Sequence, residues 1–247
     1  MTELLIGTSG YSYQHWRTCF YPEELREKDW LSYYARHFKT VELNVTFYRL
    51  PDKKAFETWR IKTPCDFRFA VKGSRYITHI KRLISCEEPL SKFFENTSLL
   101  EEKLACILWQ FPHSMKLNLK RLETFIRELE HSSFKTRYSF EFRHPSWFCP
   151  EVARLLQSCN MNLCMADSPD YPKQEILTSD FIYLRFHGGK ILYGSECTDS
   201  EMCEWARKIQ TWTSDKKMLL CFFNNDACGF AVRNALKLRS FLEEGKV

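Results

Sequence analysis

Four side chains able to take part in acid/base or binding chemistry lie within seven residues of one another, late in residues 138–147. This segment starts as an apolar strand and ends with a carboxylate, a guanidinium, an imidazole and an indole, those of Glu141, Arg143, His144 and Trp147. In α/β proteins, functional side chains are usually found where parallel strands end. Because strand side chains repeat every two residues, Glu141 and Arg143 share a face and His144 points elsewhere. We therefore interpret Glu141 as a candidate general acid or base.

Polar and aromatic side chains also lie at the ends of the other expected strands. The candidate ligand contacts are Arg143 and Trp147 together with Asn44, Tyr48, Lys72, Gln110, Arg185, Asn225, Asp226 and, from an aromatic N-terminal loop, Tyr11 and Trp16. Lysine and arginine suit phosphate and carboxylate groups, and aromatic rings suit stacking on a flat or sugar-like ligand. His187 shares a strand face with Arg185, so we expect it to be a second acid or base.

The same side chains also allow structural interpretations. Buried charges are costly unless they are paired. Glu42 could therefore pair with Arg143 inside the fold, and Glu141 could pair with Arg185. Asp226 precedes the last expected helix and could be its N-cap.

A metal-dependent reaction is a second possibility. Side chains that could bind a metal are spread over several expected strand ends, at Glu42, His79, Glu141, His144, Asp167, His187 and Asp226. However, the sequence has no His-x-His or His-Glu-x-x-His spacing, and we interpret His15 and His37 as surface or core residues. We therefore expect no metal and no cofactor. A metal-dependent phosphodiesterase or endonuclease-like enzyme acting on nucleic acid stays an alternative.

These side chains need a scaffold that brings strand ends together. Besides the start of residues 138–147, strand-like stretches occupy residues 4–10, 41–48, 67–73, 105–111, 162–167, 181–188 and 218–225. Helical periodicity lies between most of them, but residues 168–179 contain two prolines and no convincing helix. Eight strands that alternate with helices predict a (β/α)8 TIM barrel whose helix after strand six is short or missing. A doubly wound open sheet is the alternative.

Composition narrows the class of protein. The 247 residues contain no internal repeat or linker-like stretch, so we expect a single domain over residues 1–247. The net charge of +5 is dispersed, which supports nucleic-acid binding only weakly. The 11 cysteines include no Cys-x-x-Cys pair, a usage typical of free thiols in a reducing compartment. Since no signal peptide or membrane-spanning apolar run is present, we expect a cytoplasmic protein with no membrane partner. The oligomeric state does not follow from the sequence.

Many short blocks in a fixed order carry a resemblance to a known family. They include residues 7–10 (Gly-Thr-Ser-Gly), 41–44 (Val-Glu-Leu-Asn), 77–79 (Ile-Thr-His), 110–112 (Gln-Phe-Pro), 141–144 (Glu-Phe-Arg-His), 183–188 (Tyr-Leu-Arg-Phe-His-Gly) and 223–226 (Phe-Asn-Asn-Asp). On these blocks the chain resembles, from end to end, the YecE-like family, the domain-of-unknown-function family numbered seventy-two. The resemblance implies a TIM barrel and no particular activity. Tyr11, where family members usually have Trp, and residues 193–198 depart from the pattern.

The leading interpretation is a barrel protein that binds or transforms a small anionic or sugar-like ligand by acid/base chemistry, as a hydrolase or an isomerase would. Glu141 and His187 would carry the acid/base step, and Arg185 would bind the anion. Asn44 and Asn225 would orient the ligand through hydrogen bonds. A binding module without catalytic activity could use the same pocket and is a third possibility.

Overall fold

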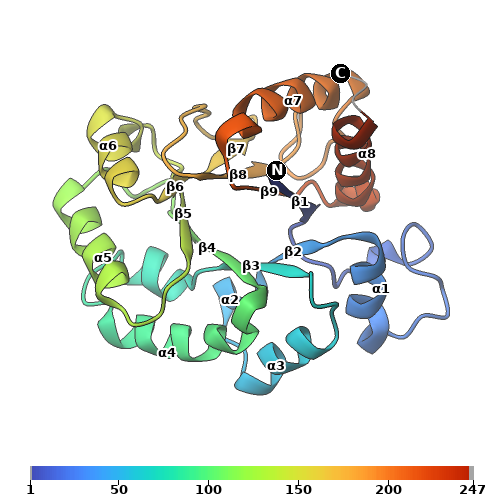
Figure 1. Cartoon of the computed structure of the whole chain (residues 1–247), viewed down its shortest axis with the longest axis horizontal. Helices are drawn as coiled ribbons and strands as arrows, with labels where there is room; N and C mark the ends of the chain where they lie inside the picture. Colours follow the sequence, from blue (N-terminus) through green and yellow to red (C-terminus); the bar gives the residue numbers. More distant parts are fainter. Residues whose placement is uncertain (1, 245–247) are drawn as a thin grey trace. The chain divides into compact units, whose positions relative to one another are not determined.

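The computed structural model describes residues 2–244, which form two parallel sheets with helices along the chain between most strands (Figure 1). The strands are β1 (Glu3–Thr8), β2 (Thr40–Leu43), β3 (Arg68–Lys72), β4 (Leu104–Gln110), β5 (Arg137–Glu141), β6 (Asn162–Leu163), β7 (Met165–Asp167), β8 (Phe181–Phe186) and β9 (Met218–Phe223). The α-helices are α1 (Trp30–His37), α2 (Val45–Tyr48), α3 (Lys53–Ile61), α4 (Glu87–Thr97), α5 (Leu119–His131), α6 (Pro150–Ser158), α7 (Asp199–Trp212) and α8 (Phe230–Glu244). The prediction of an α/β fold with parallel strands is confirmed.

The chain folds into two compact units. The first unit holds the described residues up to Glu42, Met165–Lys173 and the described residues from Asp180 onward. The second unit holds Leu43–Cys164 and Gln174–Ser179. One sheet has the strand order β1-β9-β8-β7 and the other the order β2-β3-β4-β5-β6.

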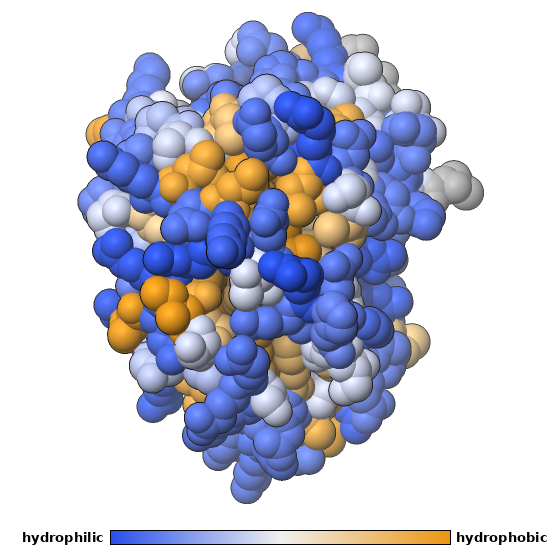
Figure 2. Space-filling model, turned by 90° about the vertical axis from the view of Figure 1, so that its left-hand side faces the viewer, coloured by the Kyte–Doolittle hydropathy of each residue, from blue (hydrophilic) through white to orange (hydrophobic). Residues whose placement is uncertain are grey.

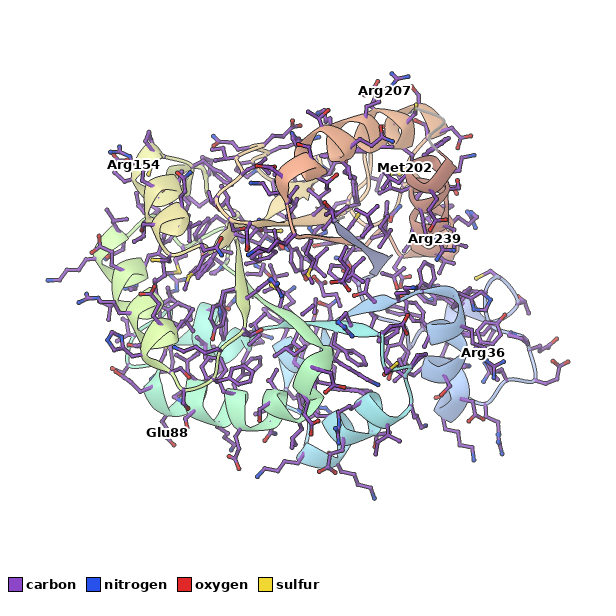
Figure 3. All side chains as sticks on the ribbon, viewed as in Figure 1. Arg36, Glu88, Arg154, Met202, Arg207 and Arg239 are labelled. Carbon is purple, nitrogen blue, oxygen red and sulfur yellow. The ribbon has the colours of Figure 1, made fainter. Side chains whose placement is uncertain are left out.

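In the first unit, β8 and β9 are buried along their whole length. Their sequences are almost continuously apolar, which is typical of parallel strands covered on both faces. Helices α7 and α8 pack against each other, and α8 also packs against β1 (Figure 1). On α7 the buried Met202 and the exposed Arg207 lie on opposite sides of the helix (Figure 3). This amphipathic arrangement places the apolar side of α7 toward the core.

In the second unit, aromatic side chains attach the helices to the sheet. The ring of Trp109 on β4 lies 5.6 Å from Phe93 of α4 and 5.3 Å from Phe125 of α5, measured between ring centroids. Two helices of this unit begin at residue types that favour N-caps: Asp52 accepts a hydrogen bond from the backbone of α3, and Asn118 from that of α5.

Two predicted strands differ from the structure. The strand expected over residues 41–48 ends at Leu43, and Val45–Tyr48 forms a helical turn. The Thr46 hydroxyl donates to the carbonyls of Leu43 (3.0 Å) and Lys72 (2.6 Å), which satisfies backbone groups that a longer strand would have to pair. The strand expected over residues 162–167 is divided at Cys164 into β6 and β7, which belong to different sheets. Residues 168–179 contain no helix, as predicted.

The face of the molecule on the side of α5 and α6 is mostly hydrophilic. Figure 2 shows on this face one larger group of apolar residues above the centre and smaller apolar groups among the hydrophilic residues. No helix among residues 2–244 is both long enough and apolar enough to cross a membrane.

Candidate functional site

Lys72, the last residue of β3, contributes a largely buried cation at the carboxyl edge of the second unit's sheet. Its side chain is only 8% exposed, and its ammonium lies 4.3 Å from the centre of the Phe47 ring. A cation at this distance from an aromatic face is stabilised by the ring quadrupole. The turn Val45–Tyr48, which replaces the predicted strand, is what brings Phe47 to this position.

His79 marks a strongly positive environment beside Lys72. It lies on a π-helical turn, Tyr76–Ile80, and its ring centroid is 5.0 Å from that of Phe47. Burial first, and then the charges of Lys72, Arg143, Arg75 and Arg82, together lower the pKa of His79 to about 4. The imidazole is therefore neutral at neutral pH, with Nδ1 2.8 Å from the Thr78 hydroxyl.

Glu141 and Arg143 form an ion pair at the end of β5. Arg143 Nε donates to Glu141 Oε1 at 2.9 Å, with the Glu141 side chain fully buried and that of Arg143 15% exposed. Gln110, at the end of β4, pairs in register with Glu141, and its amide donates to the Phe111 carbonyl at 2.7 Å. The ends of β3, β4 and β5 thus hold one carboxylate, Glu141, two cations, Lys72 and Arg143, and the amide of Gln110.

A pocket of about 390 Å³ opens in the same unit. Its lining includes Tyr48, which is 70% exposed, and residues that follow β3. A larger hollow of about 690 Å³ lies between α4 and α5, beside Ser132–Phe134. Those residues lead into β5, so this hollow is at the opposite end of the strand from Glu141. We therefore do not assign the functional site to it.

In the first unit, Glu42 is the centre of a buried network. Its Oε1 accepts hydrogen bonds from Arg185 at 2.7 Å and from Ser9 at 2.6 Å, and its Oε2 accepts one from Tyr183 at 2.7 Å. The structure shows the ion pairs Glu42 with Arg185 and Glu141 with Arg143, whereas the sequence had suggested Glu42 with Arg143 and Glu141 with Arg185. The period of a strand tells which side chains share a face, but it does not tell which strand supplies the partner.

His187, which follows β8, is fully buried and lies near two tyrosine rings. The ring centroids of Tyr171 and Tyr193 lie 5.8 Å and 5.4 Å from the imidazole, both nearly perpendicular to it. The Asn224 amide is 3.2 Å from His187 Nδ1. When the amide donates to Nδ1, the ring proton resides on Nε2, which fixes the tautomer.

Asp226 holds the aromatic N-terminal loop. Its carboxylate accepts a hydrogen bond from the Trp16 indole at 2.7 Å and lies 3.2 Å from His15 Nε2. Burial raises the pKa of Asp226 to about 6, although His15 and Trp16 act in the opposite direction. The alternative that Asp226 caps the last helix was wrong, because its side chain makes no capping hydrogen bond and α8 begins only at Phe230.

Three residues that were predicted to contact a ligand are buried in the protein. Trp16 and Trp147 are fully buried, and the Trp147 indole donates to the Met115 carbonyl at 2.6 Å. Asn225 is also fully buried, and its amide donates to Ser195 and Asn234. These three side chains contribute to the packing of the core and of the loops.

Tyr11 and Asn44 are partly accessible. Tyr11 is half-buried with its ring 6.3 Å from that of Tyr34. Asn44 precedes the turn Val45–Tyr48, and its Oδ1 is buried without a hydrogen-bond partner among the described residues. Such an atom normally finds a partner, so Asn44 stays a candidate ligand contact.

Three contributors were missed by the sequence reasoning. His15 was interpreted as a surface or core residue, but it pairs with Asp226. Arg75 and Arg82 act on His79 from the connection after β3. The concentration of basic residues in that connection, which also contains Lys81, was the signal that could have identified them. Among residues 2–244, no group of three or more His, Cys, Asp or Glu side chains could hold a metal ion.

Comparison with known proteins identifies the family. The family described as "Protein of unknown function DUF72" matches residues 5–247. The chain is 24% identical to the UPF0759 protein YunF of Bacillus subtilis (strain 168) over 271 residues, covering 97% of this chain and 95% of YunF. It is 32% identical to the UPF0759 protein YecE of Escherichia coli (strain K12) over 208 residues, covering 74% of each protein.

Solved structures agree with the sequence comparisons. A DUF72 family protein from Thermotoga maritima has a TM-score of 0.87 and 31% identity, covering 98% of this chain and 99% of that one. A DUF72 family protein from Enterococcus faecalis has a TM-score of 0.83 at 21% identity, covering 97% of this chain and 95% of that one, and shows the shared fold. The predicted resemblance is confirmed, and the chain belongs to the DUF72 family.

Proposed function

We propose that the protein binds a small anionic ligand, bearing a phosphate or a carboxylate, at the strand ends of the second unit. The contacts would come from Lys72, His79 and Arg143, with Gln110 beside them. The observation that carries this proposal is the group of four cations that act on the half-buried imidazole of His79. Burial alone would lower the pKa of the imidazole, but the four charges all act in the same direction, so their potential at His79 is positive, and a positive potential attracts anions.

A bound anion would also make His79 a useful proton donor. The negative charge would oppose the effect of the surrounding cations and raise the pKa of the imidazole from about 4 toward neutrality. General acids are most efficient when their pKa lies near the working pH. The anion would therefore both bind to the site and activate it.

The acid/base assignment of Glu141 and His187 stays a proposal. Arg143 Nε lies 2.9 Å from Glu141 Oε1 and would orient the carboxylate for the role of general base. The Asn224 amide would orient His187 so that Nε2 transfers the proton. The Arg185 guanidinium is engaged by Glu42, so we assign the anion contact to Lys72 in preference to Arg185.

We also propose a barrel architecture and a cytoplasmic location for the protein. We infer one (β/α)8 barrel domain because strands and helices alternate and the chain passes repeatedly between its two compact units. A parallel bridge between Ser9 and Glu42 supports this inference. Buried thiols such as those of Cys86, Cys197 and Cys221 support a reducing compartment such as the cytoplasm.

Titration with inorganic phosphate, followed by the imidazole NMR signals, tests the anion site. We expect phosphate to raise the pKa of His79 and to shift its signals far more than those of the exposed His131. Lys72→Met should weaken phosphate binding at least about tenfold, the effect of one partly desolvated charge. Lys54→Met, which removes an exposed lysine from α3 of the same unit, is the matched control.

Two results would reject the anion site. One is a His79 pKa that does not move at saturating phosphate, and the other is equal phosphate affinity of the K72M and K54M variants. A ligand that binds but is never turned over would favour the binding module over the enzyme. Turnover that requires an added divalent metal would favour the phosphodiesterase alternative.

A further inference from the structure

The 390 Å³ pocket of the second unit has an unusual pair of exposed aromatic side chains. Its lining includes Tyr48, Arg49, Ser74, Tyr76, Glu88 and Lys92. Tyr48 is 70% exposed and Tyr76 is 48% exposed. We call this space the tyrosine pocket. Glu88, at the start of α4, is labelled on the outer side of that helix in Figure 3.

The composition of the tyrosine pocket suits a flat ligand that also carries charge. Tyrosine supplies a large, rigid stacking surface at a low entropic cost, and such rings stack on nucleobases whatever their sequence. Arg49 and Lys92 are exposed cations on the same lining, and the Glu88 carboxylate can accept hydrogen bonds from amino or hydroxyl groups. A volume of about 390 Å³ is within the range of small-molecule sites.

Phe47 contacts both a residue that lines the tyrosine pocket and the residues of the proposed anion site. The Phe47 ring centroid lies 5.1 Å from that of Tyr48 and 5.0 Å from that of His79, and the Lys72 ammonium lies 4.3 Å from it. The π-helical turn Tyr76–Ile80 carries both Tyr76 and His79. Turns of this kind are rare and are often found at functional sites.

We propose that the anionic ligand is a mononucleotide, with its base stacked on Tyr48 and Tyr76 and its phosphate at Lys72 and His79. This inference rests on the proposed anion site and names the class of its ligand. A sugar phosphate would use the cations but would leave two large exposed rings without a partner in the complex. A nucleoside would use the rings but would bring no negative charge to Lys72 and His79.

Three related ligands separate the contribution of the base to the affinity from that of the phosphate. Adenosine 5′-monophosphate carries base and phosphate, ribose 5-phosphate lacks the base, and adenosine lacks the phosphate. Measured by calorimetry at one salt concentration, the mononucleotide should bind about 5- to 150-fold tighter than ribose 5-phosphate, the effect expected of one base–aromatic stack. It should also bind at least about tenfold tighter than adenosine because of the charge on its phosphate.

Substitutions of residues at the site show which side chains bind the base and which bind the phosphate. Tyr48→Ala and Tyr76→Ala should each lower mononucleotide affinity toward that of ribose 5-phosphate, without changing the affinity for ribose 5-phosphate itself. Tyr48→Phe and Tyr76→Phe should keep the affinity, because stacking needs the ring and not the hydroxyl. Lys72→Met should weaken both phosphate ligands and leave adenosine unchanged. Ile80→Ala changes a 61% exposed residue of the same turn and is the matched control.

The outcomes distinguish this inference from the anion site on which it rests. If ribose 5-phosphate binds as tightly as the mononucleotide and K72M weakens both, the anion site stands and the mononucleotide assignment is wrong. If Y48A and Y76A bind the mononucleotide as the unmodified protein does, the tyrosine pocket is not the base site. If neither phosphate compound binds, both proposals fail. Tighter binding of a single-stranded oligonucleotide that the mononucleotide cannot displace would also overturn the assignment.

Discussion

Arg185 and Glu42 form an ion pair whose two side chains are both fully buried, with Arg185 Nη2 2.7 Å from Glu42 Oε1. The remaining acceptor capacity of the carboxylate is used by the hydroxyls of Ser9 and Tyr183. Burying two charges is costly, and the cost is offset only when geometry and additional hydrogen bonds are good. The network around Glu42 meets these conditions.

Arg185→Met should therefore be strongly destabilising. The substitution leaves the Glu42 carboxylate buried without its counter-charge, which typically costs about 3–5 kcal/mol of the free energy of unfolding. The double variant Glu42→Gln with Arg185→Met should lose less than R185M alone, since no isolated charge remains. Urea unfolding at neutral pH measures all three proteins.

A surface pair provides the control for this prediction. Arg233 Nε lies 2.8 Å from Glu196 Oε1, but these side chains are 50% and 42% exposed. Arg233→Met should cost no more than about 1 kcal/mol. Equal losses in R185M and R233M would show that burial of the Glu42–Arg185 pair does not decide its contribution.

The sequence identified Glu42 and Arg185 as candidate ion-pair residues but did not pair them with each other, and it did not identify Ser9 and Tyr183 as their partners. Alternation along each strand identified Glu42, Glu141 and Arg185 as side chains near strand ends. Each carboxylate had more than one plausible cation, and the choice depends on which strands lie next to one another and in which register. That information comes from tertiary packing and not from the local pattern.

Side-chain hydrogen bonds to the backbone explain the other differences between the predicted and the observed structure. The stretch from Val41 to Tyr48 has the alternation of a strand, but the Thr46 hydroxyl donates to two backbone carbonyls, and the residues after Leu43 form a helical turn instead. The same turn brings Phe47 under Lys72, so this departure contributes to the proposed site. Trp147 was expected to face a ligand, but its indole found a backbone acceptor in the core at Met115.

Glu141→Gln should strengthen anion binding. The glutamine retains a hydrogen-bond acceptor for Arg143 but removes the negative charge that lies 2.9 Å from its guanidinium. The affinity for phosphate should rise about three- to tenfold, as expected when one opposing charge is removed from a partly screened site. Calorimetric titration measures the change, and Glu57→Gln on α3 controls for a general change in charge. A variant that unfolds would identify Glu141 as a structural member of the ion pair.

Gly7→Ala should disrupt the first unit. A Cβ at this position would lie 2.2 Å from the carbonyl oxygen of Thr40, a backbone atom that cannot rotate away. Overpacking of this kind costs about 3 kcal/mol or more when the neighbour is rigid. At Gly189 the nearest atom to an added Cβ is 3.1 Å away and belongs to the flexible side chain of Glu201. Thermal unfolding should therefore show a large loss for G7A and a small one for G189A.

Asp226 should make the protein less stable as pH rises through the mildly acidic range. Its pKa is about 6 in the folded protein against an ordinary value of 3.8, because burial disfavours the carboxylate. The folded state then binds the proton more tightly, so the contribution is fully present below about pH 3.8 and is lost as pH rises through 6. Asp226→Asn should remove this slope while keeping an acceptor for Trp16. Asp29→Asn on the surface should leave the slope unchanged.

His79 should make the protein less stable as pH falls, which is the opposite of the effect of Asp226, over nearly the same range of pH. Burial, and then the charges of Lys72, Arg143, Arg75 and Arg82, lower its pKa to about 4 from an ordinary value of 6.5. Between these values the unfolded state binds more protons, so the contribution is present above pH 6.5 and is lost as pH falls toward 4. His79→Gln should therefore lose less stability on acidification than the unmodified protein, whereas His131→Gln should not differ from it.

Because a bound anion would raise the pKa of His79, added phosphate should stabilise the unmodified protein more at pH 5 than at pH 7, and this difference should disappear in H79Q. An unchanged pH slope in H79Q would show that the cations around His79 do not act on its proton, and would remove the main support for the anion site.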